Sequence, residues 1–292
     1  MAVATCLLGF SNGKGRSEMV QSRMYQHLDY AQDLVEKGRV NEAQAYAELM
    51  LMREDIKVFV DRSNLPRDMR SDALRALMGA AELWESALNR EVNFRFTTRE
   101  EADVIVAYTG VMKFGGREAA GNARWSRQVQ AWSNDRYTTR VTAYITLRTH
   151  KPNGGMMNYS QMRHTAAHEF GHILGLEDSG RQGDIMGPLL FNRPVMRASD
   201  REIEGLLAFR DQVRQVLAKA DASLEATIAR NAEKKQEVSW SAAHRELETA
   251  PIRNNTPRRR NAAVRRPVRN RKAARRARSS GFGGMANPFR RL

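Results

Sequence analysis

One short run constrains this chain more than any other feature: residues 168–178 read His-Glu-Phe-Gly-His-Ile-Leu-Gly-Leu-Glu-Asp. Histidines four residues apart lie on one face of a helix, so the imidazoles of His168 and His172 converge on one point. Gly175 follows and can end that helix in a left-handed conformation. The chain then turns back, so Asp178 can approach the same point from outside the helix.

This set of residues has the chemistry of a catalytic zinc site. Imidazole nitrogens and a carboxylate oxygen are zinc ligands, and a catalytic site leaves its fourth position to water. We therefore predict that His168, His172 and Asp178 hold one Zn²⁺. Glu169 adjoins the first ligand and is predicted to be the general base, which takes the proton of the metal-activated water and passes it to the leaving amine.

Two neighbouring assignments stay open at this point. Asp178 could be a solvated turn residue, in which case Glu177 or Glu204 is the alternative third ligand. His164 lies one turn before His168 on the same face, but the helix carries it about 6 Å further along the axis. We therefore expect His164 to be half-exposed or hydrogen-bonded rather than a ligand.

The region around this run resembles the metzincins, and among them the matrixins. Their pattern is His-Glu-x-x-His-x-x-Gly-x-x-His followed by a methionine turn, which Asp184-Ile185-Met186-Gly187-Pro188 resembles. The resemblance covers about residues 54–212. It implies a zinc endopeptidase with an α/β (α+β) fold, in which a mixed twisted sheet packs with the active-site helix. It also implies that Met186 is not a ligand but packs as an apolar floor beneath the metal.

The chain departs from the matrixin pattern in three places. Asp178 stands where the family has its third histidine, and Leu190 stands where matrixins usually have a tyrosine in the wall of the substrate pocket. Within 110–136 the only acids are Glu118 and Asp135, and there is no histidine. This segment therefore lacks the ligands of the family's structural zinc, and neither structural Zn²⁺ nor Ca²⁺ is supported.

Hydrophobic periodicity divides the chain into four predicted segments. Residues 1–53 hold an apolar start and a helical hairpin broken at Gly38, which is similar either to one tetratricopeptide-type repeat or to a plain hairpin packed on the next domain. Residues 54–212 form the matrixin-like metalloprotease domain. Residues 213–249 extend a charged helix, and residues 250–292 are an Arg-rich tail whose composition predicts disorder.

The expected elements of the middle segment alternate between strands and helices. Strands are predicted at 56–61, 92–96, 102–108 and 141–147, separated by an amphipathic helix over 71–89 that includes Met78 and Trp84 in its apolar stripe. Residues 110–136 are predicted as a loop. A helix from 160 to Gly175 carries the histidines, and a Ser-x-x-Glu capping box at residues 199–202 opens a helix to about 248.

The positive charge of the chain is concentrated in its last segment. Fourteen of the 48 Lys and Arg residues lie in 252–292, which has no acid, so residues 1–251 hold 34 basic and 33 acidic residues. Such a run attracts polyanions without sequence preference. This leaves an alternative function open, namely a catalytically vestigial metzincin-fold scaffold whose tail binds nucleic acid or an acidic surface polymer. A solvated tail without function is also open.

The sequence says less about compartment and assembly. No apolar run reaches the ~18 residues that a membrane-spanning helix needs. Residues 1–10 are mostly apolar and similar to the end of a signal peptide without its positive start. A truncated signal peptide, which favours secretion or the cell envelope, and an ordinary apolar N-terminus both fit. Cys6 is the single cysteine, so no intramolecular disulfide can form, and no pattern indicates an oligomeric state.

Overall fold

The computed structural model describes residues 15–52, 55–114, 116–133 and 135–249, without the side chains of 114, 117 and 237–249. The signal-like segment 1–10 and the Arg-rich tail 250–292 therefore lie outside the described residues. The chain up to Val238 forms one compact unit, and the chain from Ser239 forms a second. Of the second unit, only the end of the last helix lies within the described residues.

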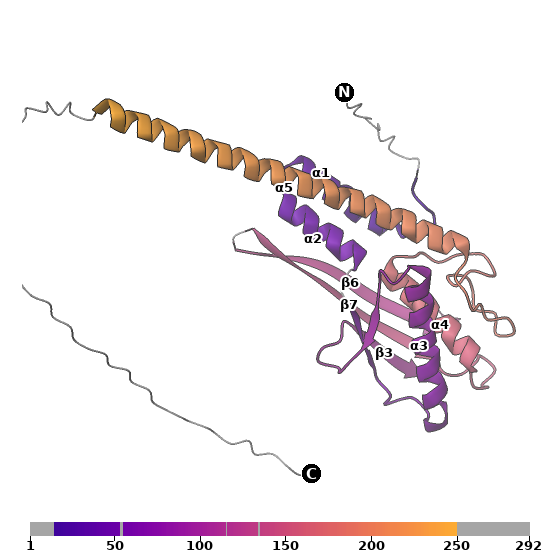
Figure 1. Ribbon diagram of the computed structural model, residues 1–292. Coiled ribbons are helices and arrows are strands. Elements are labelled where there is room, and N and C mark those ends of the chain that lie inside the picture. Colours follow the sequence, from indigo (N-terminus) through magenta and orange to yellow (C-terminus); the bar gives the residue numbers. More distant parts are fainter. Residues whose placement is uncertain (1–14, 53–54, 115, 134, 250–292) are drawn as a thin grey trace, which may run out of the picture. The chain divides into compact units, whose positions relative to one another are not determined.

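A five-stranded mixed sheet lies at the centre of the first unit, with the strand order β2-β1-β3-β7-β6 (Figure 1). Neighbours among β2, β1, β3 and β7 are parallel, and β6 runs antiparallel to β7 at the edge. The strands are β1 (Ile56–Val60), β2 (Phe94–Phe96), β3 (Val104–Thr109), β6 (Gly121–Trp132) and β7 (Arg136–Arg148). The predicted α/β class with a mixed sheet is confirmed.

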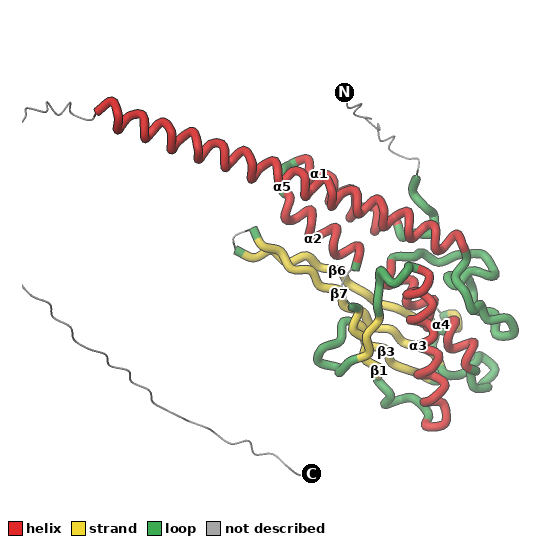
Figure 2. The backbone as a smooth tube through the Cα atoms, in the orientation of Figure 1, coloured by secondary structure: helices red, strands yellow, loops and turns green. Residues whose placement is uncertain are grey.

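Two helices cover one face of this sheet, α3 (Arg70–Ala87), which follows a 3-10 turn η1 (Arg67–Met69), and α4 (Tyr159–Leu174) (Figure 2). Alternate residues of β3, Val104, Val106 and Tyr108, are buried beneath them. The indole nitrogen of Trp84 in α3 donates to the Ala167 carbonyl of α4 at 2.7 Å. This bond fixes the histidine-bearing helix against its neighbour.

The prediction for α3 was right about the helix and wrong about one core residue. Met78 is 51% exposed, although the sequence placed it in the apolar stripe. The buried face contains Trp84, as predicted, and also Ala73, Ala76 and Ala80. Small side chains let α3 approach α4 and the sheet closely, and a stripe chosen by side-chain size overlooks them.

The prediction of a loop over 110–136 is wrong. The segment forms a small hairpin of β4 (Lys113–Phe114) and β5 (Arg117–Glu118), and then β6, which pairs with β7 from Gly121 to Trp132. Because β6 is an edge strand held mainly by backbone hydrogen bonds, its side chains need no strict alternation of large apolar residues. β7 also begins earlier than predicted, at Arg136, because it completes this hairpin.

The N-terminal hairpin is present as predicted, with α1 (Ser22–Glu36) and α2 (Val40–Leu51) joined through Gly38, whose φ is +75°. Its apolar side packs against the first part of α5 (Asp200–Thr249). This second core is made of residues from both parts, among them Met24, Tyr25, Leu28, Met50, Phe209 and Val213. α2 also lies against β7. The hairpin therefore packs directly on the sheet that carries the rest of the fold.

The capping box that opens α5 is confirmed. The Ser199 N–H donates to Glu202 Oε2 at 2.7 Å, and the Glu202 N–H donates to Ser199 Oγ at 3.4 Å. Further along α5, Arg210 donates to the Leu51 carbonyl at the end of α2 and to the Glu91 carboxylate, at 2.7 and 2.9 Å. No helix in the described ranges has the length and apolar character that crossing a membrane requires.

Candidate metal centre

Local signals at both ends set the bounds of the histidine-bearing helix α4. Asn158 accepts from the Gln161 N–H, while the Gln161 side chain accepts from the Asn158 N–H, at 3.0 and 2.9 Å. At the other end Gly175 adopts φ +105°, which returns the chain toward the helix. The turn that follows carries Asp178 back over the helix face, as the sequence predicted.

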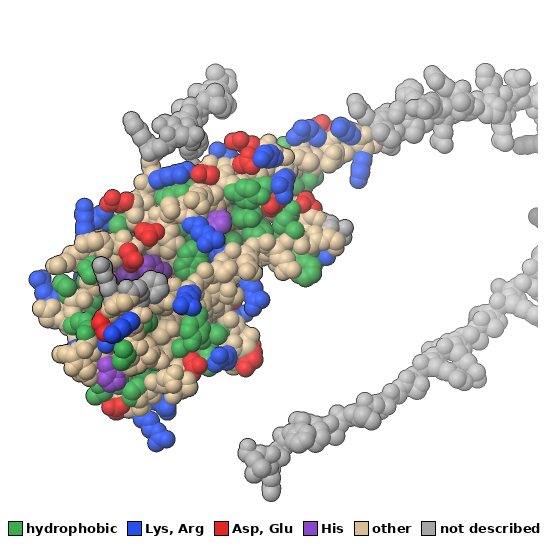
Figure 3. Space-filling view, turned by 180° about the vertical axis from the view of Figure 1, so that it is seen from behind, with side chains coloured by type: hydrophobic (Ala, Val, Ile, Leu, Met, Phe, Trp, Pro, Cys, Tyr) green, Lys and Arg blue, Asp and Glu red, His purple; other side chains and the backbone are tan. Residues whose placement is uncertain are grey.

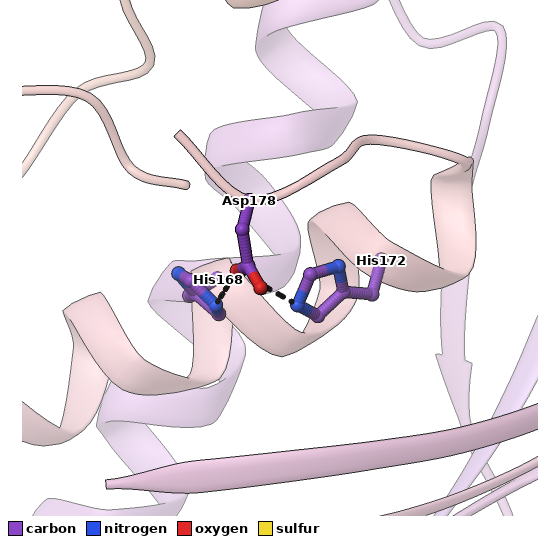
Figure 4. Close-up of side chains that lie close together, drawn as sticks. All are labelled: His168, His172 and Asp178. Carbon is purple, nitrogen blue, oxygen red and sulfur yellow. Dashed lines mark ion pairs between the residues drawn. The ribbon is translucent and has the colours of Figure 1, made fainter. Parts of the chain in front are cut away.

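The three predicted ligands come together at one point (Figure 4). His168 and His172 project from α4, and their Nε2 atoms lie 3.1 and 3.4 Å from Asp178 Oδ1. The candidate ligand atoms of the three residues all lie within 4.8 Å of one another. Within the described residues Glu177 and Glu204 are not part of this cluster, and both are exposed. The geometry therefore favours Asp178 over the two alternatives as the third ligand.

Backbone carbonyls orient both imidazoles. His168 Nδ1 lies 3.0 Å from the Ile185 carbonyl, and His172 Nδ1 lies 3.0 Å from the Leu176 carbonyl. A carbonyl can only accept, so each Nδ1 carries the proton, and in the neutral imidazole each Nε2 keeps its lone pair. Two such nitrogens facing one carboxylate oxygen form the donor set that Zn²⁺ prefers.

The charges within the cluster favour binding of a cation. In the metal-free protein the side-chain contacts with His168 and His172 lower the pKa of Asp178 well below its usual range, so its carboxylate stays ionised. Burial works against protonation of His172, but the hydrogen bonds to Asp178 and Leu176 outweigh it and raise its pKa. A metal ion that binds here therefore competes with a proton on His172.

Glu169 lies beside the ligands without joining them. Its side chain is 3% exposed, and its Oε2 atom has no hydrogen-bond partner among the described residues. Burial raises its pKa, and the neighbouring histidines only partly oppose that effect. A buried carboxyl with an unpaired oxygen and a raised pKa suits a group that exchanges protons with water. Together with the cluster, it fits a site built for a catalytic metal ion.

The methionine turn packs beneath α4. Met186 is 1% exposed, and its sulfur lies so close to Gly171 that a Cβ there would overlap it. Glu202, which is fully buried, accepts from the Met186 N–H at 2.7 Å. Sequence reasoning predicted Glu202 as a helix cap and missed this second contact, because no local pattern links the start of α5 to the turn.

A small cavity of about 140 Å³ opens beside Glu169. It lies between the start of β6 and the segment after the methionine turn, and its lining includes Gly121, His164, Thr165, Pro188 and Leu189. His164 is 1% exposed, and its Nδ1 accepts from the Val195 N–H at 2.8 Å. Burial and the charge of His168 lower its pKa to about 4. It is a hydrogen-bonded histidine outside the ligand cluster.

Comparison of the sequence with known protein families identifies the family of this chain. Residues 54–208, just over half of the chain, match the sequence model of the Matrixin family. Among curated proteins no sequence matches this chain. The matched region contains the sheet, α3, α4 and the methionine turn, and it ends within the first turns of α5. The chain therefore belongs to the matrixins, the metzincin-type zinc metalloproteases.

Proposed function

We propose that this protein is an active zinc-dependent endopeptidase, in which His168, His172 and Asp178 hold one Zn²⁺ and Glu169 is the general base. The observation that carries the proposal is the convergence of the three ligand atoms within 4.8 Å beside the buried, unpaired Oε2 of Glu169. A vestigial site would not need to retain both the ligand set and the proton-transfer group in this geometry.

The residues have distinct parts in the proposed reaction. A bound Zn²⁺ supplies a Lewis acid that polarises a peptide carbonyl and acidifies water. Glu169 accepts the proton of the attacking water and returns it to the amine nitrogen when the peptide bond breaks. Because its side chain is buried, its carboxylate is poorly solvated and readily takes up that proton. The carbonyls of Ile185 and Leu176 keep the imidazoles oriented throughout.

The position of β6 supports cleavage within a polypeptide rather than at its end. β6 is the edge strand of the sheet, and its first residue, Gly121, lies against Glu169. The free backbone groups of an edge strand can pair with an extended peptide that continues on both sides of the scissile bond.

The proposed function is tested on the full-length protein with Glu169→Ala. We expect this variant to bind zinc as the wild type does and to lose nearly all hydrolysis of a casein substrate, because the change removes proton transfer and not a ligand. Glu177→Ala, which changes an exposed neighbour of Asp178, is the matched control and should keep both properties. Casein cleavage by Glu169→Ala at the wild-type rate would show that the mechanism is wrong.

A further inference from the structure

A segment far from the matrixin-like region in sequence pairs with the turn that carries Asp178. Residues 19–21 and 175–177 form an isolated antiparallel bridge centred on Val20 and Leu176. Two backbone hydrogen bonds of 2.9 Å, one in each direction, flank this pair. The third-ligand turn has no helix or strand of its own, so it is held by this bridge together with the hydrogen bond from the Ser179 N–H to the Met186 carbonyl at 2.7 Å.

The side chain of Gln21 extends the same contact toward the metal site. Its Nε2 donates to the carbonyls of Leu176 and His172, at 2.8 and 3.3 Å. The Leu176 carbonyl also accepts from His172 Nδ1. The Leu176 carbonyl oxygen therefore accepts two hydrogen bonds, one from Gln21 and one from the predicted ligand His172. Gln21 thus helps to fix the position of the oxygen that orients the His172 imidazole.

Burial of Gln21 is not explained by packing alone. The residue is 8% exposed, and its Oε1 has no hydrogen-bond partner among the described residues. An unpaired buried acceptor destabilises the folded state. An apolar side chain of the same length would avoid that cost, so the donor contacts of the amide are the feature that an apolar residue could not supply.

The same segment also reaches the far side of the turn. Glu18 pairs with Arg201 at the start of α5, and Arg201 Nη1 lies 3.7 Å from Asp184 of the methionine turn. Asp184 in turn accepts from Ser179 Oγ at 2.6 Å. Ser179 directly follows the third ligand, so Glu18 is linked to this end of the turn indirectly, through Arg201 and Asp184.

We infer that Gln21 is a positioning residue of the metal centre, and that residues 18–21 belong to this centre although they lie outside the matrixin match at 54–208. The inference rests on the proposed function. Its physical basis is that a ligand on an irregular turn binds tightly only when other contacts hold the turn in place, and loss of such outer contacts weakens metal binding by about 10–100-fold.

The test measures zinc affinity of the full-length protein by competition with a chromophoric chelator. Gln21→Met keeps the length of the side chain and removes both donors. We expect the zinc dissociation constant to rise about 10-fold or more, while the melting temperature of the metal-free protein changes little. Gln44→Met is the matched control, because Gln44 belongs to the same hairpin and donates to Asp221 of α5 at 2.6 Å, away from the ligands.

A double variant shows whether Gln21 acts through the turn. In an Asp178→Ala background the ligand that the turn positions is gone, so Gln21→Met should weaken zinc binding less than it does in the wild type. Unchanged zinc affinity in Gln21→Met overturns the inference, whether or not the melting temperature of the metal-free protein falls.

A milder variant covers the case in which Gln21→Met does not fold. Gln21→Asn keeps the amide and shortens its reach by one methylene. Its zinc dissociation constant should rise, while the melting temperature of the metal-free protein should change little. A wild-type protein that binds no zinc would overturn the proposed function, and this inference with it. A wild type that binds zinc with both Gln21 variants equal to it would overturn the inference alone.

Discussion

Gly121 lies directly against Glu169, so closely that a methyl group on its Cα would overlap Oε1 of the carboxyl group. Gly121 is the first residue of β6, and Glu169 is in the middle of α4. The strand thus approaches the helix at the point where the predicted base is buried. Because glycine has only a hydrogen atom in place of a side chain, β6 can approach α4 here without displacing the carboxyl group of Glu169.

Gly121→Ala should therefore impair proton transfer more than metal binding. The added methyl group would push the end of the Glu169 side chain aside, because that end is more mobile than the backbone. A displacement of about 1 Å in a catalytic group lowers the rate about 100-fold. We expect kcat on a peptide substrate to fall by about that factor, while the zinc dissociation constant stays near the wild-type value.

Gly110→Ala is the control for this prediction. A Cβ at Gly110 would meet no atom closer than 3.8 Å, so this variant should retain full activity. An unchanged kcat in Gly121→Ala, with the variant folded, would mean that Glu169 works from another position than the one described.

A second prediction concerns the third ligand. Asp178→Ala should weaken zinc binding markedly, and Asp178→His should bind zinc better than Asp178→Ala, since imidazole is also a good zinc ligand. His172→Ala should lose both zinc and activity. Metal content after dialysis and the zinc-induced rise in melting temperature measure these effects. If Asp178→Ala bound zinc as tightly as the wild type, Glu177 and Glu204 would be the next residues to substitute.

A third prediction links stability to pH through Glu91. Burial works against ionisation of this carboxyl group, but the hydrogen bonds and charges of Arg210 and Arg214 outweigh burial and lower its pKa below the ordinary value of 4.5. A carboxyl group with a lowered pKa stabilises the fold above its unfolded pKa, and this contribution disappears as the pH falls through the folded value. Glu91→Gln should therefore lower the melting temperature at neutral pH, with a loss of about 1–2 kcal/mol.

The pH dependence distinguishes this effect from a general loss of packing. The difference in melting temperature between the wild type and Glu91→Gln should start to shrink as the pH falls below 4.5 and vanish below the lower folded-state pKa, where Glu91 is protonated in the folded wild type as well. Asp211→Asn is the control, since Asp211 pairs with Arg214 at the surface and its side chain is 64% exposed; such pairs contribute little. A constant difference across the pH range would contradict the prediction.

The fourth prediction concerns the tail, which lies outside the described residues. The stretch from Arg258 to Arg278 holds eleven Lys and Arg residues and no acid, whereas cationic and anionic side chains are interspersed on the described surface seen in Figure 3. Deletion of 252–292 should abolish retention on heparin or DNA, and the retention of the full chain should weaken steeply with salt. No aromatic residue lies between 252 and 281, so base stacking cannot add sequence preference.

Hydrolysis of a short neutral peptide should survive this deletion, because the remaining 251 residues are nearly balanced in charge. Retention that persists unchanged in the shortened protein would move the polyanion contact onto the folded unit. Loss of peptide hydrolysis would mean that the tail takes part in catalysis.

Several features of the candidate site could be predicted because short contiguous stretches encode them. The spacing of His168 and His172 places both imidazoles on one helix face, and Gly175 ends the helix wherever the rest of the chain lies. The Ser199–Glu202 capping box is local in the same way. Each depends on helical geometry over a few residues, so the sequence alone determined the ligand-bearing helix, its end and the start of α5.

Contacts between distant residues were decided by the tertiary structure alone. The polar strand β6 exists because β7 pairs with it, and Met78 is exposed because alanines let α3 pack closely on its other side. Gly121 contacts Glu169, and Gln21 contacts the turn before Asp178, although long stretches of chain separate the partners. Hydrophobic periodicity cannot predict such contacts, because they depend on how whole elements pack. That packing is set by burial and hydrogen bonding over the entire core rather than within any one segment.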